Sequence, residues 1–438
     1  MGTQKHLDIA IIGGGIAGLT LAIALHHRGV PFTLYEQAHA FGEIGAGVSF
    51  TPSAVQAMQC CHDGIFDAFE KVCTRNEWES KQTVWFDYHD GYNTPPGPSF
   101  PISNSLGQRG VHRAEFLDQL VKLIPQHVAR FNKVLTSITT AASGKLVMAF
   151  GDGTTAEADA IIGCDGIKSR VRQELFPTCK PSYSHKYAYR GLIPMKQAID
   201  AVGNENAQNA CMYSRKYSNR AQMGPGGHVL TFPVKSGTVM NVVAFHTSEE
   251  PWQDSERNVR TATRADALRD FAGYGEDVTK ILQLTDEKLN VWAIFDLHDN
   301  PVPLFYQGRV CISGDAAHAT SPHHGAGAGF CIEDSAVLAA LLSHEAINSP
   351  ADLELAFAVF DECRRERGQW LVESSRFIGD CYEWRAEGVG NDFAKIENEI
   401  NRRNSIIADV DVAVMCQQAR DTLSRKCGSL VRGFSANI

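Results

Sequence analysis

The stretch Ser321–Phe330 reads SPHHGAGAGF, in which two adjacent histidines precede three glycines that alternate with alanines. Such a loop could hold a metal ion, a phosphate group or a flat ligand that must approach the backbone closely. Neighbouring side chains do not generally point the same way, so His323 and His324 are not expected to share an ion, and no carboxylate or thiol cluster lies beside them. The sequence therefore predicts no metal site and leaves the other two chemistries open.

A second glycine-rich turn, Gly13–Gly18, has the spacing GxGxxG. It follows the β-branched run Leu7–Ile12 and precedes a helical pattern over Leu19–His27. A strand, this turn and a helix in succession can hold a pyrophosphate, because the backbone approaches it closely and the helix N-terminus offers N–H donors. Glu36 follows the next expected strand, Pro31–Tyr35, where an acid accepts hydrogen bonds from a ribose. The pattern predicts one bound dinucleotide, NAD or FAD.

Two later segments repeat the order of strand, glycine and aspartate. Residues Ala160–Arg172 place Asp165 after a buried strand, and Arg309–His318 place Asp315 in the same way. Because ligands of an open α/β sheet bind beyond the carboxyl ends of its strands, both carboxylates are expected near the ligand. No second GxGxxG occurs, so a second nucleotide would have to bind without a fingerprint domain of its own.

The composition sets limits on the class of protein. The 438 residues carry a formal charge of −9, with 44% hydrophobic and 21% charged residues, as in ordinary globular proteins. This balance disfavours nucleic acid and membranes as partners and favours a small molecule. The twelve cysteines form no CxxC pair or zinc spacing, which favours a reducing compartment. The apolar run Ile9–Leu25 has patterned glycines and no obvious cleavage site, so we expect a buried strand and helix and a cytoplasmic location.

Taken together, these motifs resemble those of the single-component FAD-dependent aromatic hydroxylases, the group A flavoprotein monooxygenases. The shared features are GxGxxG at Gly13–Gly18, a DG motif that begins at Asp165, and a GD motif that ends at Asp315 and leads into the SPHHGAGAGF loop. The stretches Val111–Arg113 and Tyr189–Pro194 are most similar to the salicylate hydroxylase branch. The resemblance covers most of the chain and implies that the resident dinucleotide is FAD.

The resemblance also implies roles for single residues. Glu36 would bind the adenosine ribose, Arg113 would reach the FAD backbone, and Asp315 would accept hydrogen bonds from the ribityl chain. Asp165 would secure its turn near FAD and the reductant, although an Asp before Gly often only stabilises a turn. For Arg113 the alternative is a solvated position on a helix. The expected cofactor-binding residues are Gly13, Gly15, Ile16, Ala17, Gly18, Glu36, Gly47, Arg113, Asp165, Asp315, Gly325, Gly327 and Ala328.

A bound flavin would explain why the residues of this loop are small. A helix that begins near Gly327 would point backbone N–H groups and a positive dipole end at the flat ring, whose reduced form is negative near N1. Pro322 then fits a rigid wall of the substrate pocket. Bulky side chains in the loop would hold the flavin away.

The middle of the chain is expected to contact the substrate. The alternating runs Val229–Val234 and Val239–Phe245 suit an antiparallel sheet over the flavin. Arg190 is the expected ligand of a substrate carboxylate or phenolate, with a surface position as the alternative. His228 and His323 are the expected proton route, because histidine titrates near neutral pH, with a structural role as the alternative for each. The expected catalytic residues are Arg190, His228, Pro322 and His323.

The expected fold is α/β, with a Rossmann-like FAD-binding domain interleaved with an antiparallel-sheet substrate domain, and C-terminal helices. We assign residues 1–75, 105–180 and 295–365 to the FAD-binding domain, 76–104 and 181–294 to the substrate-binding domain, and 366–438 to a C-terminal helical segment. The charged run Arg364–Arg367 is expected on a solvated helix face. The sequence does not choose between a monomer and a homodimer.

The function implied by the resemblance is that of an NAD(P)H- and FAD-dependent monooxygenase, which hydroxylates a small phenol or phenolic acid with O2 through a flavin C4a-hydroperoxide. Salicylate-type hydroxylation with loss of carbon dioxide is the specific expectation, with NADH or NADPH as a transient co-substrate. One alternative is hydroxylation and dearomatisation of a larger phenolic metabolite. A second is a flavin-binding redox module without hydroxylase activity, because a fold alone does not define a function.

Overall fold

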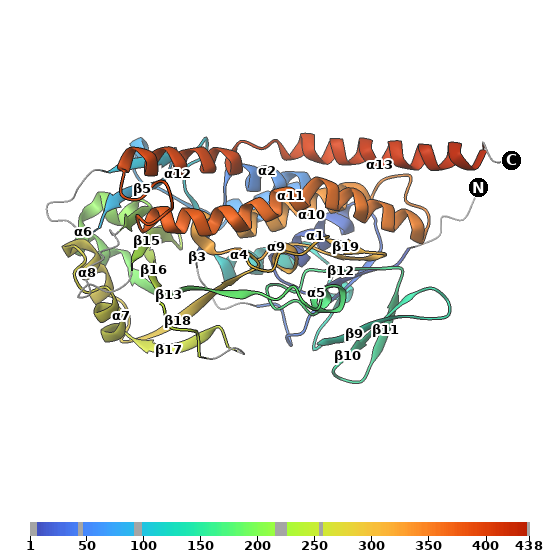
Figure 1. The fold of residues 1–438 in the computed structure, drawn as a ribbon, viewed down its shortest axis with the longest axis horizontal. Coiled ribbons are helices and arrows are strands. Elements are labelled where there is room, and N and C mark those ends of the chain that lie inside the picture. Colours follow the sequence, from blue (N-terminus) through green and yellow to red (C-terminus); the bar gives the residue numbers. More distant parts are fainter. Residues whose placement is uncertain (1–6, 43–46, 92–98, 215–225, 254–256, 436–438) are drawn as a thin grey trace.

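The computed structural model describes residues 7–42, 47–91, 99–214, 226–253 and 257–435 of the chain. Residues 43–46, which precede the expected cofactor residue Gly47, lie outside the described residues. Two large sheets make up the body of the molecule, and the long C-terminal helices run along one side of it (Figure 1). The expected mixed α/β fold is confirmed.

The first large sheet is almost entirely parallel. In order across the sheet, its strands are β19 (Tyr306–Gln307), β20 (Val310–Ile312), β12 (Ala160–Gly163), β1 (Ile9–Ile12), β2 (Phe32–Tyr35) and β8 (Ala129–Arg130). Neighbours from β20 to β8 are parallel, and β19 joins the edge in antiparallel fashion. β1 and β12 are buried at every residue, as their apolar runs require. Because parallel strands end at one edge, the residues that follow β20, β12, β1 and β2 come together there.

Helices and small sheets surround this parallel sheet. The helices are α1 (Ile16–His27), α2 (Pro52–Cys61), α3 (Asp63–Glu70), α4 (Arg113–Leu120), α5 (Arg170–Leu175), α9 (Asp315–His318) and α10 (Gly327–Leu342). One small sheet has the order β3 (Gly47–Ser49), β7 (Arg109–His112) and β4 (Thr74–Arg75), and another has β11 (Thr155–Ala158), β10 (Leu146–Phe150) and β9 (Leu135–Thr140). α1 and α10 lie side by side, and the Ser335 hydroxyl donates to the carbonyl of Ala17 at 3.1 Å.

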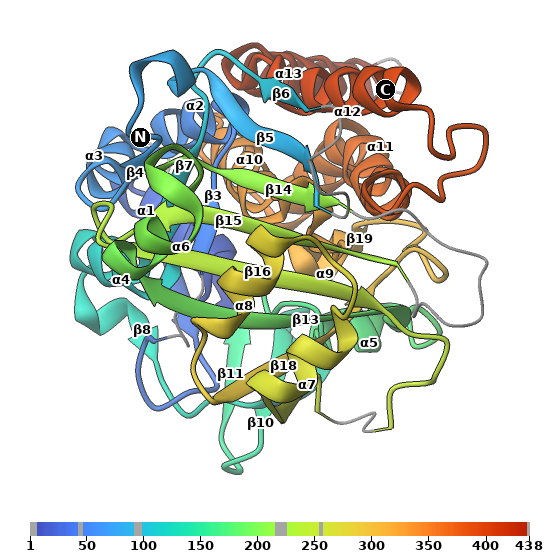
Figure 2. The same cartoon turned by 90° about the vertical axis from the view of Figure 1, so that its left-hand side faces the viewer.

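The second large sheet has eight strands. In order they are β17 (Val259–Thr263), β18 (Lys288–Asp296), β13 (Ser182–Pro194), β16 (Val239–Thr247), β15 (Gly227–Val234), β14 (Cys211–Ser214), β5 (Val84–Asp90) and β6 (Phe100–Ser103). All neighbours are antiparallel except β14 and β5. Helices α6 (Met195–Gln208), α7 (Arg264–Asp270) and α8 (Glu276–Gln283) cover one face, which is turned to the viewer in Figure 2.

The alternation of side chains decides what the other face of this sheet carries. In β16, Val242 and Ala244 pack with the helices, so Val243 and Phe245 point to the opposite face. In β13, Tyr189 packs with the helices, and its neighbour Arg190 therefore lies on the same face as Phe245. A cationic side chain is thus placed on an otherwise apolar inner face.

The C-terminal part consists of three helices, α11 (Pro350–Tyr382), α12 (Phe393–Ala408) and α13 (Val412–Ser435). α11 starts at the N-cap Ser349, whose hydroxyl accepts from the N–H of Asp352. The proposed domain boundary between residues 365 and 366 falls inside α11, so no break in the chain marks it, and the domain division stays a prediction. α12 buries Ile396, Ile400 and Ile407 against the body. No helix in the described ranges is both long and apolar enough to cross a bilayer.

Candidate functional site

A cavity of about 970 Å³ lies where the carboxyl edge of the parallel sheet meets the inner face of the eight-stranded sheet. All the site residues expected from the sequence line this cavity except Gly18 and His228. Those that line it are Gly13, Gly15, Ile16, Ala17, Glu36, Gly47, Arg113, Asp165, Arg190, Asp315, Pro322, His323, Gly325, Gly327 and Ala328. Segments far apart in the sequence therefore share one cavity, and what each residue binds there stays a prediction.

The N-terminus of α1 opens into this cavity. Its N-cap residue is Gly15, no described side chain caps the first turn, and that turn contains no acid. The first N–H groups and the positive end of the helix dipole therefore suit an anion. Gly18 lies away from the cavity, and a Cβ there would come within 1.9 Å of the carbonyl oxygen of Gly13. Its role is close packing of the helix on the turn.

Glu36 follows β2 and lies beside the same turn. Its Oε2 accepts from the N–H of Gly14 at 2.6 Å, and its Oε1 accepts from the N–H of Ala38 at 2.7 Å. These bonds fix the carboxylate at the wall of the cavity. A carboxylate has about four acceptor positions, so Glu36 keeps capacity for the hydroxyls of a ribose.

Asp165 follows β12 and has a structural role as well as a place in the cavity. Its Oδ2 accepts from the N–H groups of Arg170 at 2.7 Å and Val171 at 3.1 Å, at the start of α5. Its Oδ1 is buried and has no hydrogen-bond partner in the part of the chain that the structure describes. Burial raises the pKa of Asp165 above its ordinary value. A ligand hydroxyl would satisfy the orphaned oxygen.

Asp315 follows β20, and the buried carboxylate of Asp334 holds the turn before it. Gly314 has a φ of +61°, which suits glycine, and its N–H donates to Asp334 Oδ2 at 2.9 Å. His318 Nε2 donates to the same oxygen at 2.7 Å. Asp334 therefore fixes both ends of the short segment that presents Asp315 to the cavity.

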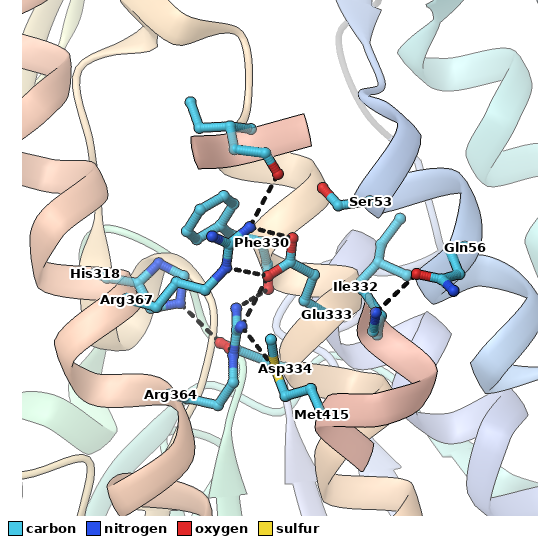
Figure 3. A network of polar contacts seen from close by, with 12 residues as sticks. Ser53, Gln56, His318, Phe330, Ile332, Glu333, Asp334, Arg364, Arg367 and Met415 are labelled. Carbon is cyan, nitrogen blue, oxygen red and sulfur yellow. Dashed lines mark hydrogen bonds and ion pairs between the residues drawn. The ribbon is translucent and has the colours of Figure 1, made fainter. Parts of the chain in front are cut away.

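The arginines of α11 complete this network (Figure 3). Fully buried Arg364 lies 2.7 Å from both Glu333 and Asp334, and Arg367 lies 2.9 Å from Glu333. Burial opposes the charge on Asp334, but His318 and Arg364 outweigh it and lower the pKa of Asp334. The expectation of a solvated face is wrong for fully buried Arg364 and for Arg367, whose side chain is only 12% exposed, because both pair with buried acids of α10.

The loop of small residues leads into α10, which begins at Gly327. Gly325 has a φ of +65°, and no described side chain or acid caps the first turn of α10. A second positive helix end therefore faces the cavity. His324 points away from it, with Nε2 lying 2.8 Å from Ser374 Oγ, and burial followed by the charge of Arg403 lowers the pKa of His324 to about 3. Within the described ranges, no three His, Cys, Asp or Glu side chains form a metal-binding group.

Arg190 is the main cationic feature of the sheet side of the cavity. Its Nε is buried without a hydrogen-bond partner among the described residues, and its Cζ lies 5.0 Å from the ring centre of Trp292. Burial and, second, the nearby charge of Arg113 lower the pKa of Arg190 to about 10. Arg113 is the first residue of α4 and also lines the cavity. Two guanidinium groups that face one cavity favour an anionic ligand.

The two histidines expected in a proton route occupy different positions. His323 lines the cavity, whereas His228 is buried behind it on β15. Their ring centres are 5.2 Å apart, and His228 stacks on Phe245 with ring centres 4.6 Å apart. His228 can thus act on a ligand only through another group.

Several residues of the site were not expected from the sequence. The inner face of the eight-stranded sheet supplies an apolar wall of Phe86, Leu230, Phe232, Val243, Phe245, Ile294 and Phe295. The alternation of side chains along the strands predicts these wall residues once the inner face of the sheet is known. Fully buried Arg172 donates to the carbonyl of Ala316 at 2.9 Å and also to that of Ile167, so it joins the Asp165 turn to the Asp315 segment. No local pattern marks that link.

These residues fit an FAD molecule. Two helix N-termini without a described side-chain cap face the cavity. The N-terminus of α1 suits a pyrophosphate, and that of α10 suits the electron-rich end of a flavin. Carboxylates lie at Glu36, Asp165 and Asp315, and the Oδ1 of Asp165 lacks a described partner. Residues 325–329 of the loop are only glycine and alanine, so a flat ring can approach their backbone closely.

Comparison with known proteins agrees with this fit. Residues 6–374 match the family described as FAD binding domain. The FAD-dependent monooxygenase pigN of Monascus ruber is 44% identical over 97% of this chain and 98% of its own length. Salicylate hydroxylase asL1 of Sarocladium schorii is 40% identical over 95% of this chain and 91% of its own. A solved structure titled salicylate hydroxylase substrate complex is 33% identical, with a TM-score of 0.82 over 95% of this chain and 98% of that one.

The fold, the cavity and these similarities define a class: the protein is an FAD-dependent monooxygenase with the fold of salicylate hydroxylase. More particularly, the chain belongs to the FAD binding domain family, in its branch of single-component aromatic hydroxylases.

Proposed function

We propose that this enzyme uses NAD(P)H and O2 to hydroxylate a phenol or phenolic acid that binds as an anion against Arg190. The observation that carries the proposal is the half-buried guanidinium of Arg190, whose Nε has no described partner and which lines the cavity beside Arg113. A buried N–H donor without a partner in such a place gains a charge-assisted hydrogen bond when an anionic ligand enters.

The residues around Arg190 suit this reaction. Bound FAD would supply the activation of O2, and attack on an aromatic ring is easier when the phenol has lost its proton. Arg190 holds the electron-rich phenolate or carboxylate, and Pro322 forms a rigid wall opposite the sheet. Phe232 and Phe245 exclude water from the face of the ring. The positive end of α10 stabilises negative charge that develops near its first turn.

For the substrate we propose a salicylate-type phenolic acid, which would be hydroxylated with loss of carbon dioxide. The support is the similarity to asL1 and to the substrate complex, both called salicylate hydroxylases. The alternative is a larger phenol that keeps all its carbons, for which the long apolar wall from Phe86 to Phe295 offers contact area. Release of carbon dioxide separates the two.

The remaining partners are also proposals. NADH or NADPH would bind transiently, since the one GxGxxG turn is taken by FAD. A cytoplasmic location is supported by twelve cysteines that are all unpaired.

The test is oxidation of NADH and of NADPH by the purified yellow protein, with and without salicylate and a series of larger phenols, with carbon dioxide and peroxide measured together. Salicylate-stimulated oxidation with carbon dioxide and little peroxide supports the salicylate-type reaction. Stimulation by a larger phenol, with hydroxylated product and no carbon dioxide, moves the substrate to that phenol. Absence of stimulation by every phenol contradicts the proposal.

A further inference from the structure

A buried polar cluster lies at one end of the inner face of the eight-stranded sheet, next to the cavity. Glu383, directly after α11, is fully buried, and its Oε1 lies 2.7 Å from Lys186 Nζ and 3.3 Å from His228 Nδ1. The hydroxyl of Thr247 donates to Glu383 Oε2 at 2.8 Å. Lys186 lies two residues before Ala188 and four before Arg190, so β13 presents it on the face that lines the cavity. The site described so far uses neither Lys186 nor Glu383.

The backbone is strained on both sides of this cluster. His185, directly before Lys186, has a φ of +59°, and β13 contains a register shift between Tyr183 and Lys186. Trp384, directly after Glu383, has a φ of +58°. Such conformations of bulky residues persist only where the surroundings hold them, and they collect at functional sites.

Hydrogen bonds hold the second of these strained turns in place. The indole Nε1 of Trp384 donates to Tyr88 OH at 2.9 Å and to Ser214 Oγ at 3.1 Å. All three side chains are buried. The backbone next to Glu383 is therefore held in place, and its carboxylate lies 3.3 Å from His228 Nδ1.

The cluster reaches the cavity through His323. This imidazole lines the cavity, and both of its ring nitrogens are buried without a hydrogen-bond partner among the residues that the structure describes. Its ring lies 5.2 Å from that of His228, centre to centre, so that one water molecule between the rings could carry a proton. α11 packs so closely on it that a Cβ at Gly379 would lie 2.5 Å from His323 Cδ2. Buried polar atoms normally have a hydrogen-bond partner, so the two ring nitrogens of His323 are an exception that points to a function.

The other end of the cluster reaches solvent. Lys186 Nζ lies 3.2 Å from Asp380 Oδ1, and the Asp380 side chain is 36% exposed. Arg385 Nε lies 3.3 Å from Glu383 Oε2, and its side chain is 28% exposed. A row of ionisable groups thus extends from the cavity to the surface at the end of α11.

We infer that Glu383 is a positioning residue for the proton route through His323 and His228 that the sequence predicts. The inference rests on the proposed function, because it assigns the path to the proton of a bound phenol. The phenol O–H bond breaks, its electron pair stays on the oxygen, and the proton forms an N–H bond on His323. The proton then leaves His323 as that N–H bond breaks and a new N–H bond forms on His228. A water molecule finally takes the proton from His228, which leaves both imidazoles neutral.

The charges around His228 suit a transient carrier. Burial lowers the pKa of both His228 and His323, so both are neutral at pH 7 and can accept a proton. Burial would raise the pKa of Glu383, but Lys186 and His228 outweigh it and hold that pKa well below its usual range. The ionised Glu383 carboxylate, 3.3 Å from His228 Nδ1, stabilises a positive charge on that imidazole. The ring of Tyr382, 5.3 Å from that of His228, completes the surroundings.

The test uses the FAD-loaded enzyme and 4-nitrophenol, whose ionisation is visible by absorbance. After rapid mixing, we expect the phenolate to appear at least about tenfold more slowly in Glu383→Gln and His228→Ala than in the wild type, as for loss of a general base. Added imidazole should restore the rate in His228→Ala. The matched control is Asp270→Asn. The Asp270 carboxylate accepts from Tyr187 at 2.7 Å and Tyr189 at 2.5 Å on the helix face of the same sheet, so this substitution should leave the rate unchanged.

Wild-type rates in both variants would overturn the inference. A slow rate in His228→Ala that imidazole does not restore would also overturn it, because free imidazole replaces a proton carrier but not a merely structural histidine. If the wild type does not ionise bound 4-nitrophenol at all, the inference falls. Normal ionisation of the probe without any phenol-stimulated oxidation of NAD(P)H would instead contradict the proposed function and leave the path intact.

Discussion

Asp334 accepts a hydrogen bond from the backbone N–H of Gly314 at 2.9 Å, so a buried carboxylate on α10 fixes the turn that presents Asp315 to the cavity. The same carboxylate is paired with buried Arg364 at 2.7 Å. The cofactor side of the cavity is therefore supported by a charge network in the core, while the substrate side carries Arg190 without a comparable support.

Asp315→Ala should weaken FAD binding about tenfold to a hundredfold, because loss of charge-assisted hydrogen bonds to a buried ligand costs about 1.5–3 kcal/mol. The measurement is the dissociation constant of FAD from the apoprotein, followed by flavin fluorescence. Asp299→Ala, which removes an acid paired with Arg376 outside the cavity, is the control and should bind FAD normally. Full flavin retention in Asp315→Ala would contradict the assignment.

Asp334→Asn should destabilise the whole protein. The change leaves Arg364 buried with one carboxylate fewer, and breaking a buried ion pair costs about 3–5 kcal/mol. We expect a lower midpoint of urea unfolding with an unchanged slope, in the FAD-free protein as well as the loaded one. An effect seen only in the loaded protein would mean that Asp334 acts on the cofactor and not on the fold.

Arg190→Ala should raise the KM for an acidic phenol about tenfold to a hundredfold with little change in flavin content, because only a contact to the substrate anion is lost. Arg260→Ala is the matched control, since Arg260 lies over Tyr187 and Trp252 on the helix face, with distances of 5.8 Å and 4.8 Å to their ring centres. Equal KM values in Arg190→Ala and wild type would remove Arg190 from the substrate site.

Buried histidines should make the fold sensitive to acid. The pKa of His324 is lowered to about 3 in the folded chain, against about 6.5 when unfolded. A depressed pKa contributes stability that is present above pH 6.5 and is lost as the pH falls toward the folded value. From His324 alone we expect a loss of up to about 2 kcal/mol between pH 6.5 and pH 5. Urea unfolding at both pH values should show a smaller loss in His324→Gln, and an equal loss would contradict this origin.

The sequence was sufficient for the parts of the site that local patterns encode. The turn Gly13–Gly18 with its flanking strand and helix, and the two Asp residues after strands, depend on neighbours in the chain, and they lie where the patterns predict. Arg364 was misjudged because its partners Glu333 and Asp334 lie about thirty positions away along the chain, and no charge pattern within one helix reveals them.

Glu383 shows the same limit more clearly. Its contacts come from Lys186, His228 and Thr247, on three strands far away in the sequence, and only the folded sheet brings them together. Arg190 was undecided from the sequence, because alternation fixes which residues share a face and not which face is inward. The register of β13 against β16 resolves that choice.

The central claim is that the cavity hydroxylates a phenol held against Arg190. The most direct test is turnover of salicylate with NADH or NADPH under isotopically labelled O2, with the aromatic product examined by mass spectrometry. We predict one labelled oxygen atom in the product and one carbon dioxide released for each NAD(P)H consumed. Label found only in peroxide, or a product whose new oxygen comes from water, would contradict the account.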